Sequence, residues 1–130
     1  MEDALDQAVQ LPVASYEKAT ATAAEVLTYF LTNKYDRGAV KAYVSLSHIH
    51  HRSRKYQKAL HYDSLALRLS DQIEYDQGRA WAFGNIGREM KALGDIQASK
   101  VNYEKALAIT PSATDQQVDD LLTYYNQLGV

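Results

Sequence analysis

The chain lacks cysteine and long apolar stretches, and each absence excludes a class of protein. Without cysteine there is no disulfide bridge and no thiolate metal site. No apolar run approaches the roughly 20 residues that a membrane-spanning helix needs, so we expect no contact with a membrane interior. The acidic start over residues 1–6 lacks the basic and apolar parts of a secretion signal. Together these absences predict a cytoplasmic protein.

Net charge is also nearly absent, at −2 for 130 residues. A balance this small gives no overall attraction to nucleic acid or to anionic lipid. A short basic cluster contains Arg52, Arg54, Lys55 and Lys58, but no nucleic-acid-reading motif accompanies it, so we expect no nucleic-acid partner. The hydrophobic fraction of 46% is sufficient for one domain with a core.

What the sequence does contain is an internal repeat. Lys34 to Gly38 reads KYDRG and Glu74 to Gly78 reads EYDQG, an offset of 40 residues. The same offset relates SYEKA at 15–19 to KYQKA at 55–59. A fixed period of 20 to 50 residues is typical of stacked-repeat proteins, which present long surfaces to other molecules.

Apolar residues recur at steps of three and four along almost the whole chain, which predicts helices and no strands. We expect helices over 13–31, 39–52, 56–70, 80–93, 96–109 and 114–128, with a weaker signal over 1–11. Short turns are expected at Ser53–Lys55 and at Gly94-Asp95. A longer connection, Asp71–Gln77, is expected between the two repeats, with Asp76 as a helix N-cap. The fold class is therefore all-α.

Residues 80–111 carry the pattern of one known family. Their large and small positions are Phe83, Ile86-Gly87, Met90, Ser99, Tyr103, Ala106 and Pro111. Residues 40–70 repeat it with Tyr43, Leu46-Ser47, His50, Ala59 and Ala66, and depart from it at Asp63, where an aromatic residue is usual. This pattern resembles the tetratricopeptide repeat. The resemblance implies an α-α superhelix, a solenoid of antiparallel helix hairpins.

The period of 40 residues exceeds the usual length of about 34. It resembles the subgroup with longer loops between repeats, seen in Pins-type polarity adaptors and bacterial regulators. We expect a single domain over residues 1–130. Its parts would be a half repeat at 13–31, repeats at 38–77 and 78–113, and a capping or half-repeat helix at 114–130.

The resemblance implies that the first helix of each repeat lines a concave groove. The residues expected to face it are Lys41, Val44, Ser45, His48, His51, Arg52, Trp81, Asn85, Arg88 and Lys91. Because this set is basic, we expect the groove to hold an acidic or carboxylate-bearing segment of a protein partner. The protein would then be a scaffold, adaptor or sensor module without a cofactor.

Two alternatives remain at this point. The last predicted helix carries apolar residues with no helix after it, which would favour self-assembly through the ends of the solenoid. These residues are Leu121, Leu122, Tyr124, Tyr125 and Leu128. Enzymatic activity is not expected, because no catalytic or phosphate-binding motif is present.

The histidines suggest a metal site or a pH-sensitive groove. His48 and His51 lie one helical turn apart, but no carboxylate stands at the spacing that would complete a metal site, so we expect none. A groove that changes charge near pH 6.5 is the other possibility, since histidine titrates there.

Overall fold

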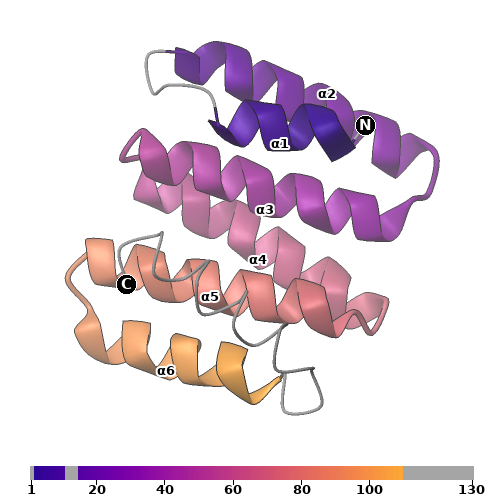
Figure 1. Cartoon of the computed structure of the whole chain (residues 1–130). Helices are drawn as coiled ribbons and strands as arrows, with labels where there is room; N and C mark the ends of the chain where they lie inside the picture. The colour runs from indigo at the N-terminus through magenta and orange to yellow at the C-terminus, as the bar shows by residue number, and fades with distance from the viewer. Residues whose placement is uncertain (1, 11–14, 110–130) are drawn as a thin grey trace.

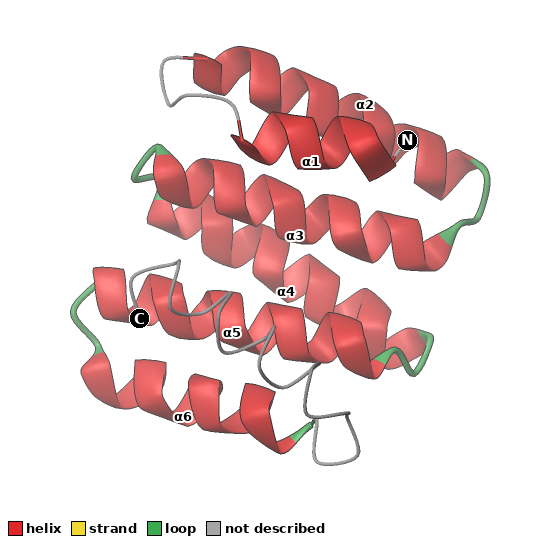
Figure 2. Ribbon diagram, in the orientation of Figure 1, coloured by secondary structure: helices red, strands yellow, loops and turns green. Residues whose placement is uncertain are grey.

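The computed structural model describes residues 2–10 and 15–109, and in this part of the chain it consists of helices without strands (Figure 1, Figure 2). In chain order they are α1 (Glu2–Gln10), α2 (Tyr16–Thr32), α3 (Asp36–Arg52), α4 (Tyr56–Gln72), α5 (Asp76–Ala92) and α6 (Ile96–Ala108). Each helix packs against the next one in the chain. The all-α helical-repeat prediction is confirmed.

The four central helices, α2 to α5, each have 17 residues, and the turns that follow them have three. A helix and its turn take 20 residues, so two of them account for the 40-residue repeat of the sequence. The predicted connection at Asp71–Gln77 is therefore wrong. Helix α4 continues to Gln72, and α5 begins at Asp76, directly after the turn. The extra length of this repeat lies in its helices and not in its loops.

All four turns have the same backbone structure. Their middle residues have positive φ angles: 56° at Lys34, 61° at Arg54, 53° at Glu74 and 90° at Gly94. In each turn the next amide donates to a carbonyl five residues earlier, as from Lys55 to His50 at 2.8 Å. This hydrogen bond defines the Schellman motif, which ends a helix by satisfying its last carbonyls. Because the motif is so compact, the next helix begins at once.

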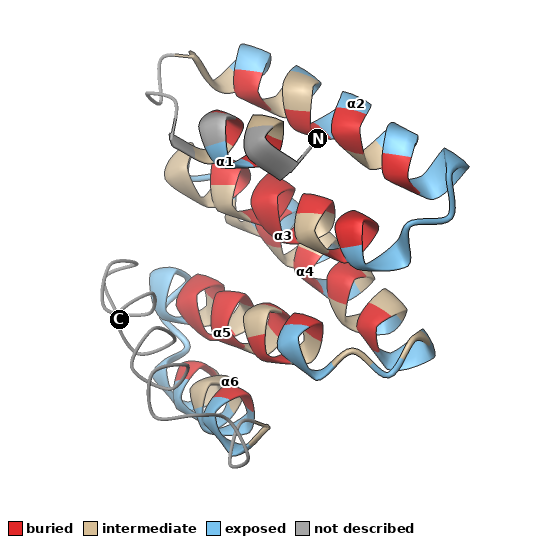
Figure 3. Ribbon diagram, turned by 45° about the vertical axis from the view of Figure 1, so that its right-hand side comes forward, coloured by how far each residue is buried: buried red, intermediate tan, exposed pale blue. Residues whose placement is uncertain are grey.

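The helices α1, α3 and α5 lie along one side of the stack, which we call the inner face. Here α1 contacts α3, and α3 contacts α5, whereas α3 and α5 also pack on the helices that precede and follow them. The middle of α3 and α5 is consequently the most buried part of the described chain (Figure 3).

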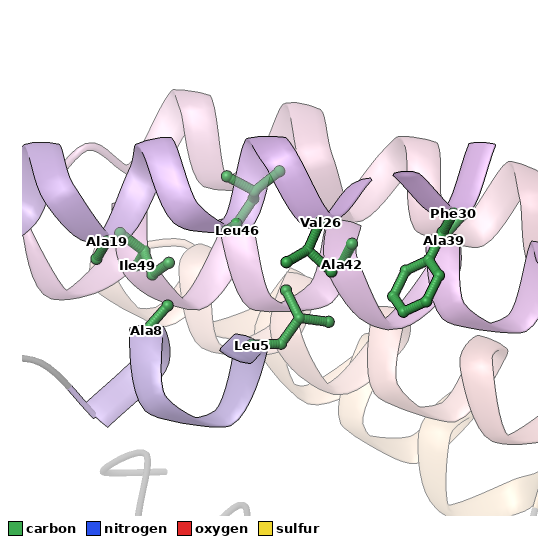
Figure 4. Close-up of a cluster of buried hydrophobic side chains, with 10 residues drawn as sticks. Leu5, Ala8, Ala19, Val26, Phe30, Ala39, Ala42, Leu46 and Ile49 are labelled. Carbon is green, nitrogen blue, oxygen red and sulfur yellow. The ribbon is translucent and has the colours of Figure 1, made fainter. Parts of the chain in front are cut away.

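Helix α1 belongs to the core and is not an appendage. It packs against both α2 and α3, as α3 packs against α4 and α5. Leu5 is fully buried, and Ala8 is 2% exposed. They share a cluster with residues of α2 and α3, in which Figure 4 labels Val26, Phe30 and Leu46. The sequence predicted a single helix at 13–31 with an uncertain helix before it, but the structure pairs α2 with α1.

The repeated glycines of the sequence mark points of close approach. A Cβ atom on Gly38 would lie 2.8 Å from Phe30 Cγ, and one on Gly78 would lie 2.8 Å from Val40 Cγ1. Real Cβ atoms do not approach carbon atoms so closely, so glycine lets α3 and α5 begin against their neighbours.

Two further predictions concern the ends of the chain and the membrane. The predicted helix 114–128, with the five residues proposed for self-association, lies outside the described residues. Among the helices that are described, none combines the length and apolar character needed to span a membrane.

Candidate functional site

The inner face contains a pocket where α1, α3 and α5 meet, which we call the inner pocket. Its volume is about 210 Å³. It is lined by Asp6 and Val9 of α1, by Lys41, Val44, Ser45 and His48 of α3, and by Trp81 of α5. Three helices that are far apart in sequence therefore form one small cavity with valine and tryptophan in its wall.

Five residues that the sequence predicted for the groove line this pocket together: Lys41, Val44, Ser45, His48 and Trp81. They come from equivalent helices of two repeats, which explains why periodicity could select them. Sequence reasoning missed Asp6 and Val9, because the helical signal of α1 is short. The signal that could have found them is the apolar spacing of Leu5, Ala8 and Val9 at steps of three and four.

Two basic residues of the predicted groove contact α1. The Lys41 ammonium lies 3.5 Å from a carboxylate oxygen of Asp6. The Arg52 guanidinium donates a hydrogen bond to the carbonyl of Val9, near the end of α1. Part of the positive charge expected to meet a partner is thus directed to the protein's own first helix.

Two other predicted groove residues are buried. Asn85 is fully buried and Arg88 is only 2% exposed. The prediction that they face the groove is wrong, because α3, α4 and α6 all pack on α5 and leave it little free surface. Arg88 instead donates to the buried carboxylate of Glu89, with Nε 3.2 Å from Oε1.

The remaining two predicted groove residues are His51 and Lys91. His51 is partly buried, and its Nδ1 lies 2.5 Å from Oε1 of Glu89. Lys91 is exposed near the end of α5. Neither of them lines the inner pocket.

His48 connects the two repeats across the inner face. Its Nδ1 lies 3.0 Å from Nη1 of Arg88, the equivalent residue 40 positions later. Burial, with smaller contributions from the nearby charges of Arg88, Arg52 and His51, lowers the pKa of His48 to about 3. The imidazole is therefore neutral near neutral pH and does not change its charge there. A pH-sensitive groove based on His48 is not supported.

Asp63 of α4 is a buried acid that the sequence noted only as a departure from the family pattern. It is fully buried, with an exposed fraction of 0%. Burial, and secondarily the charge of Glu89, raise the pKa of Asp63 well above its usual value, while Ser47, Arg88 and Asn85 oppose this shift. A buried cluster of polar groups therefore joins α3, α4 and α5 behind the inner face.

The described part of the chain contains no cluster of possible metal ligands. Among the described residues, no three histidine, cysteine, aspartate or glutamate side chains gather closely enough to hold an ion.

Comparison with known proteins gives one match. The tetratricopeptide repeat model matches residues 39–112, which include α3 from its fourth residue onward and all of α4, α5 and α6. No curated protein and no solved structure matches the chain significantly. The match covers more than half of the sequence, and the stacked helical pairs agree with it, so this chain belongs to the tetratricopeptide repeat family.

Proposed function

We propose that this protein recognises a partner protein through the inner pocket, which receives one apolar side chain of the partner. Repeats of this family are generally protein–protein interaction modules and are typically non-enzymatic scaffolds. The observation that carries the proposal is the pocket itself, with Val9, Val44 and Trp81 in its wall. Apolar and aromatic groups in a small pocket are typical of the anchor points that dominate binding energy at protein interfaces.

The partner segment carries an acidic residue beside its apolar anchor. Lys41 lines the pocket, and its side chain is 27% exposed. A carboxylate of the partner would join or replace Asp6 as its counter-ion. Because Arg88 is buried and Arg52 binds the end of α1, this single contact replaces the broad basic groove that the sequence suggested. The apolar anchor then provides most of the affinity, and the acidic residue provides selectivity.

A selection from a displayed library of random peptides tests the proposal. Trp81 is the only tryptophan of the chain, so its fluorescence reports directly on this pocket. We expect enriched peptides to contain a large apolar residue next to an acidic one and to shift the tryptophan emission. Trp81→Ala should weaken binding of a labelled peptide at least about tenfold, as an anchor residue does. Lys41→Gln should reduce the preference for the acidic residue.

The matched control is Lys100→Gln, an exposed lysine on α6. Peptides that bind equally well to the wild type and to Trp81→Ala would contradict the inner pocket as the site. Enrichment without acidic residues, or an acidic preference that Lys41→Gln leaves intact, would contradict the role of Lys41 alone.

Self-association is a second candidate, and exposed apolar residues on α6 favour it. Ile96 is 63% exposed and Val101 is 37% exposed. Sedimentation over a range of concentrations distinguishes the two proposals. A larger species that dissociates when Ile96 is changed to Lys would support assembly through this end, and a monomer at all concentrations would exclude it.

A further inference from the structure

A second pocket lies away from the inner face, between α2 and α4, and we call it the α2–α4 pocket. Its volume is about 480 Å³. It is lined by Tyr16 and Thr20 of α2, His50 of α3, and Gln57, Lys58, His61 and Tyr62 of α4. All of these side chains carry polar hydrogen atoms, and no carboxylate lines the pocket. Because the lining offers hydrogen-bond donors and no carboxylate, this composition favours an anion over a cation.

His50 is the buried member of this set, with 3% of its surface exposed. Its Nδ1 lies 2.7 Å from the hydroxyl of Tyr16, and its ring stacks on Tyr62 with centroids 5.3 Å apart. The other ring nitrogen, Nε2, is buried and has no hydrogen-bond partner among the described residues. A buried polar atom without a partner is costly, so a ligand that bonds to it is favoured.

The tautomer of His50 makes Nε2 a hydrogen-bond donor. Burial, followed by the charges of Lys58 and Lys55, lowers the pKa of His50 to about 4, so the ring is neutral at neutral pH and holds one proton. When the Tyr16 hydroxyl donates to Nδ1, that proton resides on Nε2. The hydroxyl of Thr20 is also buried without a partner in the described structure, which adds a second donor on α2.

The charge at this pocket is positive and uncompensated. Lys58 is exposed, and no carboxylate of the described residues lies within ion-pair distance of it. Lys55 sits over the ring of Tyr16, with its Nζ 4.6 Å from the ring centroid. Both lysines act on His50, so their field extends to the base of the pocket.

We propose that the α2–α4 pocket binds a phosphate monoester. A phosphate group has three terminal oxygens and nearly two negative charges at neutral pH. Its oxygens would accept from His50 Nε2, the Thr20 hydroxyl and the Lys58 ammonium, which come from three different helices. The rings of Tyr16 and Tyr62 form a wall against which the organic part of the ester packs. The site is independent of the inner pocket.

Calorimetric titration in a phosphate-free buffer at constant ionic strength tests this proposal, with phenyl phosphate, inorganic phosphate and benzoate as probes. We expect saturable binding of both phosphates, with phenyl phosphate tighter because its ring contacts the tyrosines. Benzoate should bind at least about tenfold more weakly than phenyl phosphate, since a carboxylate has fewer oxygens and less charge.

Two variants locate the binding. Lys58→Gln should weaken phenyl phosphate binding at least about tenfold, because a charge-assisted hydrogen bond is lost. Thr20→Val keeps the side-chain shape and removes only the hydroxyl, so it should weaken binding about threefold or more. The matched control, Lys100→Gln, removes the same charge from exposed α6 and should leave the affinity unchanged. Circular dichroism checks that each variant is folded.

Nuclear magnetic resonance gives an independent readout, because the imidazole Nε2–H signal of His50 should shift on binding. Absence of saturable binding by either phosphate would overturn the proposal. Equal weakening by Lys58→Gln and Lys100→Gln would also overturn it, because binding would then follow overall charge. Benzoate binding as tightly as phenyl phosphate would reject the phosphate in favour of a carboxylate ligand.

Discussion

At the scale of single residues, the main feature is a set of ionisable side chains buried inside a helical repeat. Glu89 and Asp63 are both fully buried, and Arg88 is 2% exposed. Glu89 has Arg88 and His51 as partners, whereas burial first, and the charge of Glu89 second, raise the pKa of Asp63. Keeping Asp63 ionised in this place costs free energy, because an acid in low dielectric favours its neutral form.

This burial predicts how stability depends on pH. Because the folded state holds the proton of Asp63 above the ordinary pKa of about 3.9, it binds more protons than the unfolded chain. Its contribution to stability is therefore present at low pH and lost as pH rises through the folded pKa. In Asp63→Asn, we expect the free energy of unfolding at pH 7 to rise by about 1 kcal/mol or more. Urea denaturation between pH 4 and pH 8 measures both the slope and the difference.

The control for this prediction is Glu104→Gln, which removes an exposed carboxylate on α6. It should follow the wild-type pH dependence. If Asp63→Asn is less stable than the wild type at pH 7 and has the same slope, the carboxylate of Asp63 is ionised and stabilising, contrary to our reading.

At the scale of elements, the recurring turn is the unit that sets the geometry of the stack. Three of its four left-handed positions are held by Lys34, Arg54 and Glu74, and only the fourth by Gly94. Residues other than glycine pay about 1 kcal/mol or more in this conformation. The three earlier turns therefore persist because the packing of the helices on both sides requires them.

The turns supply a matched pair of variants. Glu74→Gly should stabilise the protein by about 0.5–1 kcal/mol, because glycine adopts a positive φ without strain. Gly94→Ala should destabilise it by about 1 kcal/mol, and no atom lies within 4 Å of the added Cβ, so the effect would be purely conformational. Midpoints of urea denaturation measure both changes. Shifts of the same sign in both variants would show that contacts, and not backbone conformation, govern these turns.

At the scale of the whole molecule, the described helices form a linear stack in which each helix packs on the next one in the chain, and α1, α3 and α5 also contact one another in turn along the inner face. Helix α6 packs on α5, while α1 packs on α2 and α3 at the other end. Such a stack can open locally at one end without losing the other. The inner pocket depends on several helices of the stack, because residues of α1, α3 and α5 line it together.

Truncation of the α1 anchor tests this picture. Leu5→Ala should lower stability by about 2–4 kcal/mol, the range for a buried leucine. Hydrogen exchange should speed up in α1, α2 and the adjoining part of α3, while α5 and α6 stay protected. Leu5→Ala should also weaken the binding of any ligand in the inner pocket. Uniform loss of protection over all helices would mean that the stack unfolds as one cooperative unit.

Much of this architecture follows from local features of the sequence. The positions of Gly38 and Gly78 fix the 40-residue period, and the apolar steps along each segment predict the helices. Five residues of the inner pocket could be selected because they occupy equivalent faces of two repeats. These properties depend on near neighbours in the chain, which periodicity records.

Tertiary structure decided what periodicity does not record. Whether Asn85 and Arg88 face solvent depends on how many helices pack on α5, and Asp6 reaches the pocket only because α1 lies beside α3. The raised pKa of Asp63 comes first from its burial by the packed helices and then from the charge of Glu89 on α5. The same packing buries Nε2 of His50 without a hydrogen-bond partner among the described residues. Helical spacing determines which residues share a face, but burial and charge depend on what lies opposite that face, and only the packed structure supplies it.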